Sequence, residues 1–441
     1  MNIKVAAVSL GCPKNMTDLE VMLAKIVESG MEIVNEDEAD VIIVNTCAFI
    51  GDAKEESIDV ISDVLNLKEN GSLKAVVATG CLAELFGEKL FEEIPNLDVV
   101  VSLGKNSDIV NILKECFECE KTLHKCTNTE LPLDGERLCL SASYTAYVKI
   151  AEGCDNHCAY CIIPKIRGKF RSRGFESILE EVKVLAARGV KELVLIAQDT
   201  TRWGSDLENK PDLADLVEKI SEIDGICWIR IMYAYPDGIS EKLLHLMRDN
   251  EKLVEYIDMP IQHCEDNVLK RMGRRDDKKA VSEKLEKMRE IVPNIAIRTT
   301  LITGFSGETV ADFRELKKFV KEQAFTHLGC FVYSREEGTP AYNLPEQVEE
   351  SEKLRRQNAV LDVQDEVVKT YYKSLKNMII EGIVEGYDDF LKLYFGRLRT
   401  QAPEIDGNVF FSSENALTAG GIINIKITGT IENQLFGIHY I

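Results

Sequence analysis

The densest group of residues with recognisable chemistry is a set of three cysteines in the stretch KIAEGCDNHCAYC. Cys154, Cys158 and Cys161 form the pattern C-x3-C-x2-C. Three thiolates in a tight turn suit an iron–sulfur cluster, whereas a zinc site would require a fourth ligand nearby. Three protein ligands leave one iron of a [4Fe–4S] cluster open. The spacing therefore predicts a cluster that binds a small molecule as well as carrying an electron.

A second set of cysteines is spread over the first hundred residues. Cys12, Cys47 and Cys81 each stand at the end of a short apolar run, namely VAAVSL, DVIIVNT and KAVVATG. Such runs, separated by amphipathic segments, predict a parallel α/β sheet. Ligands bind such sheets at the carboxyl ends of the strands. We therefore expect these three thiols to converge, although more than thirty residues separate each from the next.

Four further cysteines lie in a polar segment, 116–140, that has little periodicity. His124 is too close to Cys126 for a usual zinc knuckle. We interpret the segment as a linker between domains and its thiols as incidental. They are Cys116, Cys119, Cys126 and Cys139.

Composition limits the classes of protein that fit. A chain of 441 residues with 45% hydrophobic content predicts two to three globular domains. We find no run approaching the roughly 18 apolar residues that a membrane span requires. Thirteen cysteines without a secretion signal favour metal or catalytic roles over disulfides. The net charge of −21 disfavours nucleic acid and favours a basic partner. We expect a cytoplasmic protein with no membrane partner.

We call Cys154, Cys158 and Cys161 the middle cysteines. The elements that must position them alternate between strands and helices. The strand YTAYVKI precedes the cysteines, and five more apolar runs follow them: ELVLIA, CWIRIMY, VEYIDMP, IAIRTTLI and HLGCFVY. A closed barrel of the commonest kind needs eight strands, so six predict an open (β/α)6 partial barrel. Polar residues at the strand ends are candidate cofactor contacts, together with the aromatic residue before the third cysteine. The candidates are Tyr160, Gln198, Gln262 and Arg298, although each could equally be a rim or capping residue.

A basic island, KIRGKFRSR, follows the third of these cysteines in an otherwise acidic chain. Its side chains are candidates for contact with an acidic substrate group or a cofactor carboxylate, and a solvated loop is the alternative interpretation. The candidates are Lys165, Arg167, Lys169, Arg171 and Arg173.

The pattern changes again near residue 374. Five short β stretches with Gly and Asp at the turns predict a small antiparallel barrel of the oligonucleotide-binding sort. A helical segment, SEKLRRQNAVLDVQDEVVKTYYKSL, connects it to the preceding part. The predicted fold class is α/β, with four segments: an N-terminal parallel domain (1–115), a linker (116–140), a core with its connecting helix (141–373) and a C-terminal barrel (374–441).

The middle cysteine pattern is the signature of radical S-adenosylmethionine (SAM) enzymes, and the whole chain resembles the methylthiotransferase family within them. The resemblance rests on GCPKN, VNTC and TGCL in the first domain, EGCDNHCAYCIIPKIRGKFRSR in the core and GRLRTQAPEIDG in the C-terminal part. It implies a TRAM domain and two [4Fe–4S] clusters. The auxiliary cluster would be held by Cys12, Cys47 and Cys81, and the radical-SAM cluster by Cys154, Cys158 and Cys161.

The resemblance also implies the reaction. SAM would serve as methyl donor and radical source, a sulfur source would supply the inserted atom, and a flavodoxin or ferredoxin would supply electrons. SLGCPKN, LIAQDTTRWG and APEIDG resemble the branch that modifies the beta carbon of an aspartate in small-subunit ribosomal protein S-twelve. The alternatives are a tRNA adenosine methylthiotransferase and, more remotely, a non-catalytic iron–sulfur or electron-transfer protein. Departures from the family pattern, such as Ser306 where proline is common, touch no cluster ligand.

Overall fold

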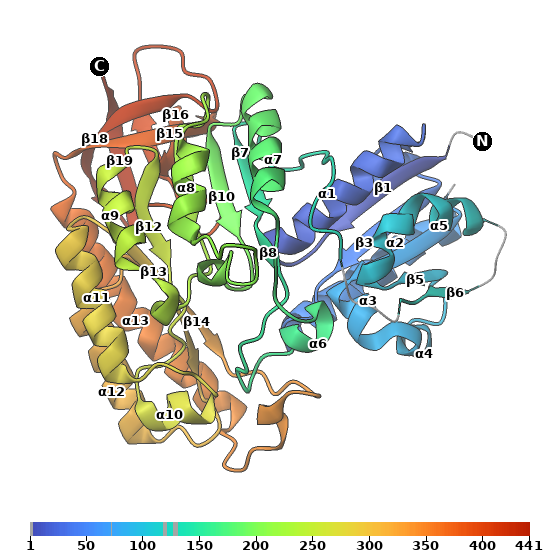
Figure 1. The fold of residues 1–441 in the computed structure, drawn as a ribbon, viewed down its shortest axis with the longest axis horizontal. Helices are drawn as coiled ribbons and strands as arrows, with labels where there is room; N and C mark the ends of the chain where they lie inside the picture. Colours follow the sequence, from blue (N-terminus) through green and yellow to red (C-terminus); the bar gives the residue numbers. More distant parts are fainter. Residues whose placement is uncertain (1–2, 72, 118–120, 127–130) are drawn as a thin grey trace.

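The computed structural model describes residues 3–71, 73–117, 121–126 and 131–441. In these ranges the chain forms two parallel six-stranded sheets followed by a closed five-stranded barrel (Figure 1). The predicted α/β class and three-part architecture are confirmed. Among the described residues, no helix has both the length and the apolar character needed to cross a membrane.

The N-terminal sheet has the strand order β2-β1-β3-β4-β5-β6, with every pairing parallel. The two central strands, VIIVNT and AVVATG, are buried along their whole length. Burial of this kind is typical of a parallel sheet covered by helices. The strands are β1 (Lys4–Ser9), β2 (Glu32–Ile33), β3 (Val41–Thr46), β4 (Ala75–Gly80), β5 (Val99–Val101) and β6 (Thr122–His124); the helices are α1 (Pro13–Glu28), α2 (Gly51–Asn70), α3 (Cys81–Phe86), α4 (Leu90–Glu93) and α5 (Ile109–Glu115).

Part of the predicted linker belongs to this sheet. Strand β6 pairs with β5 in parallel and forms the sheet's outer edge. Three residues are too few to show a hydrophobic period, which is why the sequence pattern does not reveal the strand.

The central sheet has the order β14-β13-β12-β11-β10-β7, and all its pairings are parallel. Its edge strands β7 and β14 do not pair, so the predicted open six-stranded barrel is confirmed. The strands are β7 (Thr145–Lys149), β10 (Glu192–Ile196), β11 (Trp228–Ile231), β12 (Leu253–Asp258), β13 (Ala296–Thr303) and β14 (His327–Val332), with a separate pair β8 (Ala151–Glu152) and β9 (Arg171–Ser172). The helices are α6 (Ile163–Arg167), α7 (Phe175–Ala187), α8 (Leu213–Ser221), α9 (Glu241–Asp249), α10 (Asp266–Arg271), α11 (Lys278–Ile291) and α12 (Val310–Gln323).

The C-terminal barrel covers part of the inner face of this sheet. Alternate residues of each strand point to opposite faces. Those on the outer face pack against the helices. On the inner face, Trp228 and Tyr256 pack with Ile383 and Ala402 of the barrel. Strand β17 pairs with β19 in parallel, so the barrel is not wholly antiparallel. Helix α13 (Glu350–Ser374) packs on α12 and β14 of the core and leads into the barrel, whose strands are β15 (Ile379–Asp388), β16 (Leu393–Leu398), β17 (Val409–Ser412), β18 (Ile422–Ile431) and β19 (Gln434–Tyr440).

The N-terminal domain contacts both edges of the open barrel. Helix α1 packs against β7 and lies between the two sheets in Figure 1. On the other side, the Gly51 amide at the start of α2 donates to Ser334 Oγ at 3.3 Å, and Lys54 pairs with Glu336. The domain therefore bridges the gap between β7 and β14.

Candidate active site

The cysteines of the first domain lie at one edge of its sheet. Cys12 precedes α1, Cys47 follows β3, and Cys81 is the first residue of α3, directly after β4. Strands β1, β3 and β4 are adjacent, so their carboxyl ends meet. A Cβ on Gly11, whose φ is +83°, would stand 2.7 Å from Cys47 Sγ. Only glycine therefore lets the turn that carries Cys12 approach Cys47 this closely.

Cys47 and Cys81 are buried at this edge, and Cys12 is partly buried. Burial raises the pKa of Cys81 to about 11, and the neighbouring Cys12 and Cys47 add to the rise while Arg167 opposes it. A thiol with its pKa raised in this way stays protonated until a metal displaces the proton. As the described side chains stand, no three Cys, His, Asp or Glu groups are close enough to hold a single metal ion. Three thiols from neighbouring strand ends are the donor set that a [4Fe–4S] cluster takes, with one iron left open.

Arg167 links these thiols to the core. Its guanidinium donates to Cys81 Sγ at 3.5 Å and to Asn15 Oδ1 at 3.1 Å. It also pairs with Asp18 of α1 at 2.8 Å and with Glu152 at 3.1 Å, and only 1% of the side chain is exposed. Lys149 pairs with the same two carboxylates. Burial alone would raise the pKa of Glu152, but these two cations outweigh it and hold the pKa well below its usual range.

The middle cysteines occupy the loop between β8 and α6. The loop is pinned by backbone bonds, including Cys161 N to Cys158 O at 3.0 Å and Cys154 N to Gly168 O at 3.1 Å. Burial raises the pKa of Cys161 to about 12, and the neighbouring Cys158 and Cys154 contribute to the rise. All three thiols are free and only partly buried, which suits a cluster with one iron open to a ligand.

A lysine that the sequence prediction missed lies between the two cysteine sets. Lys14, in the first turn of α1, interacts electrostatically with Cys12 on one side and with Cys161 on the other. Its Nζ stands 3.3 Å from the centroid of the Tyr233 ring. Burial lowers the pKa of Lys14. In the sequence, the only sign that Lys14 lies at this site was its position in GCPKN, two residues after a strand-end cysteine.

The four predicted cofactor contacts differ in what they touch. Tyr160 packs edge-on against Phe305, and Gln262 has a φ of +69° and is bridged to Leu301 by its backbone. Gln198 Nε2 donates to Glu152 at 2.6 Å while its buried Oε1 has no partner.

Arg298 is engaged elsewhere. It bonds Asp406 of the C-terminal barrel at 3.2 Å and lies 3.8 Å from Asp258. Asp406 is more than a hundred residues away in sequence, so no local pattern predicts the pairing. The structure therefore favours a role for Arg298 in joining domains, and we do not carry it into the proposed cofactor site.

The basic island splits into inward and outward side chains. Arg167 is buried as described above, and Arg173 is buried against Ser177 and Glu181. Their partners lie within the chain, so we withdraw these two as substrate contacts. Arg171 is half-buried and donates to the Leu131 carbonyl at 3.1 Å. Lys165 and Lys169 are exposed.

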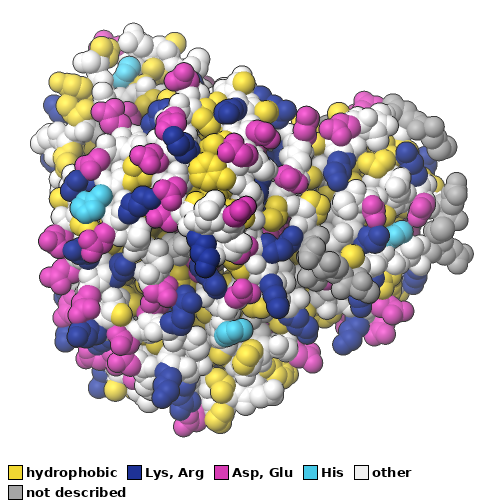
Figure 2. Space-filling model, in the orientation of Figure 1, with side chains coloured by type: hydrophobic (Ala, Val, Ile, Leu, Met, Phe, Trp, Pro, Cys, Tyr) yellow, Lys and Arg dark blue, Asp and Glu magenta, His cyan; other side chains and the backbone are white. Residues whose placement is uncertain are grey.

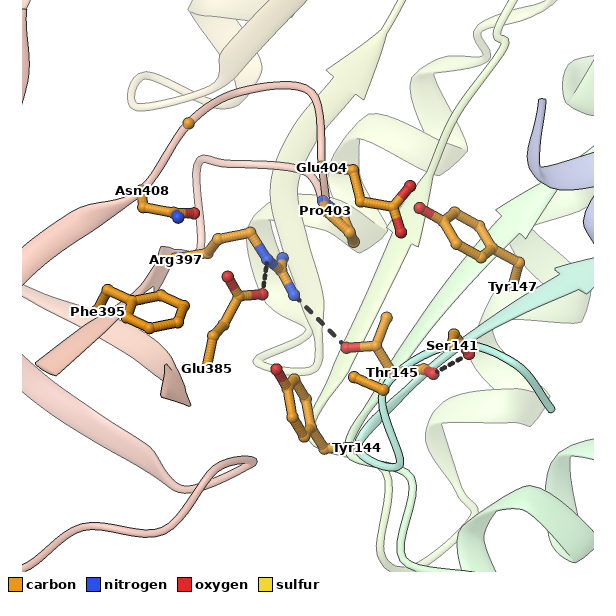
Figure 3. Close-up of a pocket in the computed structure, with 12 residues that line it drawn as sticks. Ser141, Tyr144, Thr145, Tyr147, Glu385, Phe395, Arg397, Pro403, Glu404 and Asn408 are labelled. Atoms are coloured by element: carbon orange, nitrogen blue, oxygen red, sulfur yellow. Dashed lines mark hydrogen bonds and ion pairs between the residues drawn. The ribbon is translucent and has the colours of Figure 1, made fainter. Parts of the chain in front are cut away.

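A cavity of about 360 Å³ lies between β7 and the C-terminal barrel (Figure 3). Tyr144, Tyr147 and Phe395 contribute rings to its wall, and Arg397 crosses it to bond Glu385 and Thr145. Its lining includes none of the cysteines. The cavity therefore lies at the contact between the core and the C-terminal barrel and not at a predicted cluster site.

Comparisons with known proteins agree with this architecture. The Radical SAM superfamily matches residues 148–320, the TRAM domain matches 377–439, and Uncharacterized protein family UPF0004 matches 4–102. Among solved structures, a radical SAM methyltransferase, TsrM from Kitasatospora setae, shares the fold at a TM-score of 0.56 with 14% identity, covering 77% of each chain. Fold and domain content thus define a radical-SAM enzyme with a TRAM domain, a class whose cofactors are SAM and a [4Fe–4S] cluster.

Two relatives with named functions identify the family within this class. A Clostridium acetobutylicum protein named "Ribosomal protein uS12 methylthiotransferase RimO" is 45% identical over 440 residues, covering 99% of this chain and 98% of the relative. A Geobacter sulfurreducens protein of the same name is 44% identical over 438 residues, covering 98% of each. The chain belongs to the RimO family of radical-SAM methylthiotransferases.

Proposed function

We propose that this enzyme inserts a methylthio group at the beta carbon of an aspartate in ribosomal protein uS12, the S-twelve protein of the small subunit. The observation that carries the proposal is the placement of Lys14 beside both cysteine sets, within a chain related to RimO proteins over its whole length. One set suits a radical source and the other a sulfur carrier. Because the substrate is a ribosomal protein, the proposed location is the cytoplasm.

Two [4Fe–4S] clusters are part of the proposal. Cys154, Cys158 and Cys161 would hold the radical-SAM cluster, and Cys12, Cys47 and Cys81 the auxiliary one. When bound, the clusters and SAM supply an electron for cleavage of the sulfonium and a position for the sulfur to be methylated and transferred. A sulfur source and an electron donor such as flavodoxin or ferredoxin complete the set of reactants.

The protein's own residues position this chemistry. Arg167 and Lys149, held by Asp18 and Glu152, fix α1 against the core, and α1 begins beside Cys12. The two sites therefore keep a constant separation. Tyr160 and Gln198 remain the proposed cofactor contacts on the core side, together with Gln262. Lys165 and Lys169 remain candidate contacts for substrate because they are exposed beside the loop of the middle cysteines.

Charge favours a basic protein over tRNA as the substrate. The C-terminal segment 371–441 contains six basic and eight acidic residues. Ion pairs engage groups of both signs: Arg397 pairs with Glu192 and Glu385, and Arg399 with Glu381 and Glu255. On the face in Figure 2, acidic and basic side chains are mixed. Nucleic-acid binding depends chiefly on Lys and Arg that neutralise phosphates, whereas an acidic surface speeds the encounter with a basic protein.

The test is a direct comparison of the two substrates. Anaerobically reconstituted enzyme with SAM, a sulfide source and a reductant is incubated with uS12 and, separately, with unmodified tRNA. Mass spectrometry should find a methylthio adduct on one aspartate of uS12 and none on tRNA. An adduct on tRNA alone would establish the alternative, a tRNA adenosine methylthiotransferase.

A further inference from the structure

Lys14 is a buried lysine that forms no ion pair with a described carboxylate, although the charges of Cys12, Glu152 and Asp258 act on it. Its Nζ lies 3.4 Å from the Ala197 carbonyl and 3.3 Å from the centre of the Tyr233 ring, both of which are neutral. Among the described residues, no carboxylate forms an ion pair with it. The neighbouring Lys149 and Arg167 are each paired with both Asp18 and Glu152. Of these three clustered cations, Lys14 is the one that forms no ion pair among the described residues, and its ammonium has three N–H groups to donate.

The surroundings of Lys14 have the features of a binding site. Tyr233 follows β11 with a φ of +59°, a strained conformation for a residue with a side chain, and strain of this kind concentrates at functional sites. Asp258, at the carboxyl end of β12, accepts from the Tyr233 amide with one oxygen, while its other oxygen is buried without a hydrogen bond, 3.8 Å from Arg298 Nε. Both residues lie at the strand ends where ligands bind in α/β sheets.

We propose that Lys14 binds the side-chain carboxylate of the target residue on the protein substrate. The inference rests on the proposed function, because an aspartate substrate brings a carboxylate to the space between the two cysteine sets. A charge-assisted bond from a buried ammonium to that carboxylate would give Lys14 a direct ion pair. It would also distinguish aspartate from asparagine, which has the same shape without the charge. The carboxylate of SAM is the competing source of the same chemistry.

The experiment measures binding separately from turnover. Fluorescently labelled uS12 and its variant with asparagine at the target position are titrated, in the presence of SAM, with four reconstituted enzymes. These are the wild type, Lys14→Met, Lys14→Arg, and the control Lys25→Met, which removes a lysine from the same helix α1. Circular dichroism and iron content verify that each variant is folded and loaded. SAM affinity is measured by calorimetry in parallel.

We expect Lys14→Met to weaken binding of the aspartate form roughly 10- to 100-fold, the range typical of a charge-assisted hydrogen bond, and to leave the asparagine form nearly unchanged. Lys14→Arg should restore part of the difference, and Lys25→Met should match the wild type. Equal weakening of both forms, or weakening of SAM binding alone, would overturn the inference. So would a wild type that binds both forms equally.

Failure of the proposed function gives a different result. In that case the wild type forms no methylthio adduct on uS12, whichever form of uS12 it binds more tightly.

Discussion

The two cysteine sets differ in how the chain brings them together. Cys154, Cys158 and Cys161 lie on one loop and are positioned by its backbone bonds. Cys12, Cys47 and Cys81 come from three turns and meet only because β1, β3 and β4 are neighbours in the folded sheet. The first set can therefore be recognised from spacing alone, whereas the second depends on strand order and register. Changes to the sheet should affect the second set and spare the first.

The largest expected effect is that substitutions in the two cysteine sets abolish different reactions. Alanine at Cys154, Cys158 or Cys161 should abolish formation of deoxyadenosine from SAM. Alanine at Cys12, Cys47 or Cys81 should leave deoxyadenosine detectable and stop methylthiolation, because the radical source remains intact. Both products are measured by chromatography and mass spectrometry on reconstituted enzyme. Full activity in any of the six variants would contradict the assignment.

The thiols of the predicted linker, of which Cys119 lies outside the described residues, provide the control for that experiment. Serine at Cys116, Cys119 and Cys126 together should leave the iron content unchanged. Loss of roughly one cluster's iron would show that these residues are ligands.

A smaller change tests the sheet edge directly. Gly11 and Gly30 both have a φ of +83°, but a Cβ on Gly11 would meet Cys47 Sγ at 2.7 Å, whereas a Cβ on Gly30 meets nothing within 4 Å. We expect Gly11→Ala to lose about half of the bound iron, because it displaces one ligand set. Gly30→Ala should keep all of it, with a stability loss of about 1–2 kcal/mol from the left-handed backbone. Iron assays and urea unfolding measure both variants. Equal iron contents in Gly11→Ala and Gly30→Ala would contradict the expectation.

The ion pairs that join α1 to the core should contribute measurably to stability. Arg167→Gln removes a buried cation from Asp18 and Glu152, so we expect a loss of about 3–5 kcal/mol in the free energy of unfolding. Arg171→Gln, which removes a hydrogen bond to the Leu131 carbonyl, should lose no more than about 1.5 kcal/mol. Urea titrations of the apo proteins at pH 7 measure both. Equal losses would mean that the Arg167 pairs contribute little.

The smallest effect concerns pH. Burial raises the pKa of Asp258 from 3.8 to about 6. Between these values the folded chain binds more protons than the unfolded chain, so this group's contribution to stability falls as pH rises from about 4 to 6. Asp258→Asn should remove that dependence and raise the stability of the apo protein at pH 7 by roughly 1–3 kcal/mol. A fall in stability at pH 7 would show that the carboxylate's interaction with Arg298 outweighs its burial.

Sequence patterns predict much of this molecule and miss what depends on distant partners. The apolar runs identified all six strands of the central sheet and all five of the C-terminal barrel, because each run is long enough to show its pattern. The short strands β2 and β6 were not predicted, because two or three residues are too few to show a hydrophobic pattern. Arg298, Arg167 and Arg173 stood where a ligand contact was expected, yet each is paired with a carboxylate of its own chain. Lys14 was missed because its lack of a counter-ion becomes visible only in the folded structure.

Helix α1 belongs to the N-terminal domain by sequence but is bonded along its length to the rest of the chain. Lys14 reaches Ala197, Asp18 pairs with Lys149 and Arg167, and Glu20 pairs with Arg137. A swinging motion of the domain would have to break all of these contacts at once. Under the proposed function, α1 thus ties the sulfur-carrying set to the core that holds the radical source, so movement of one set relative to the other has to break the ion pairs of α1 first.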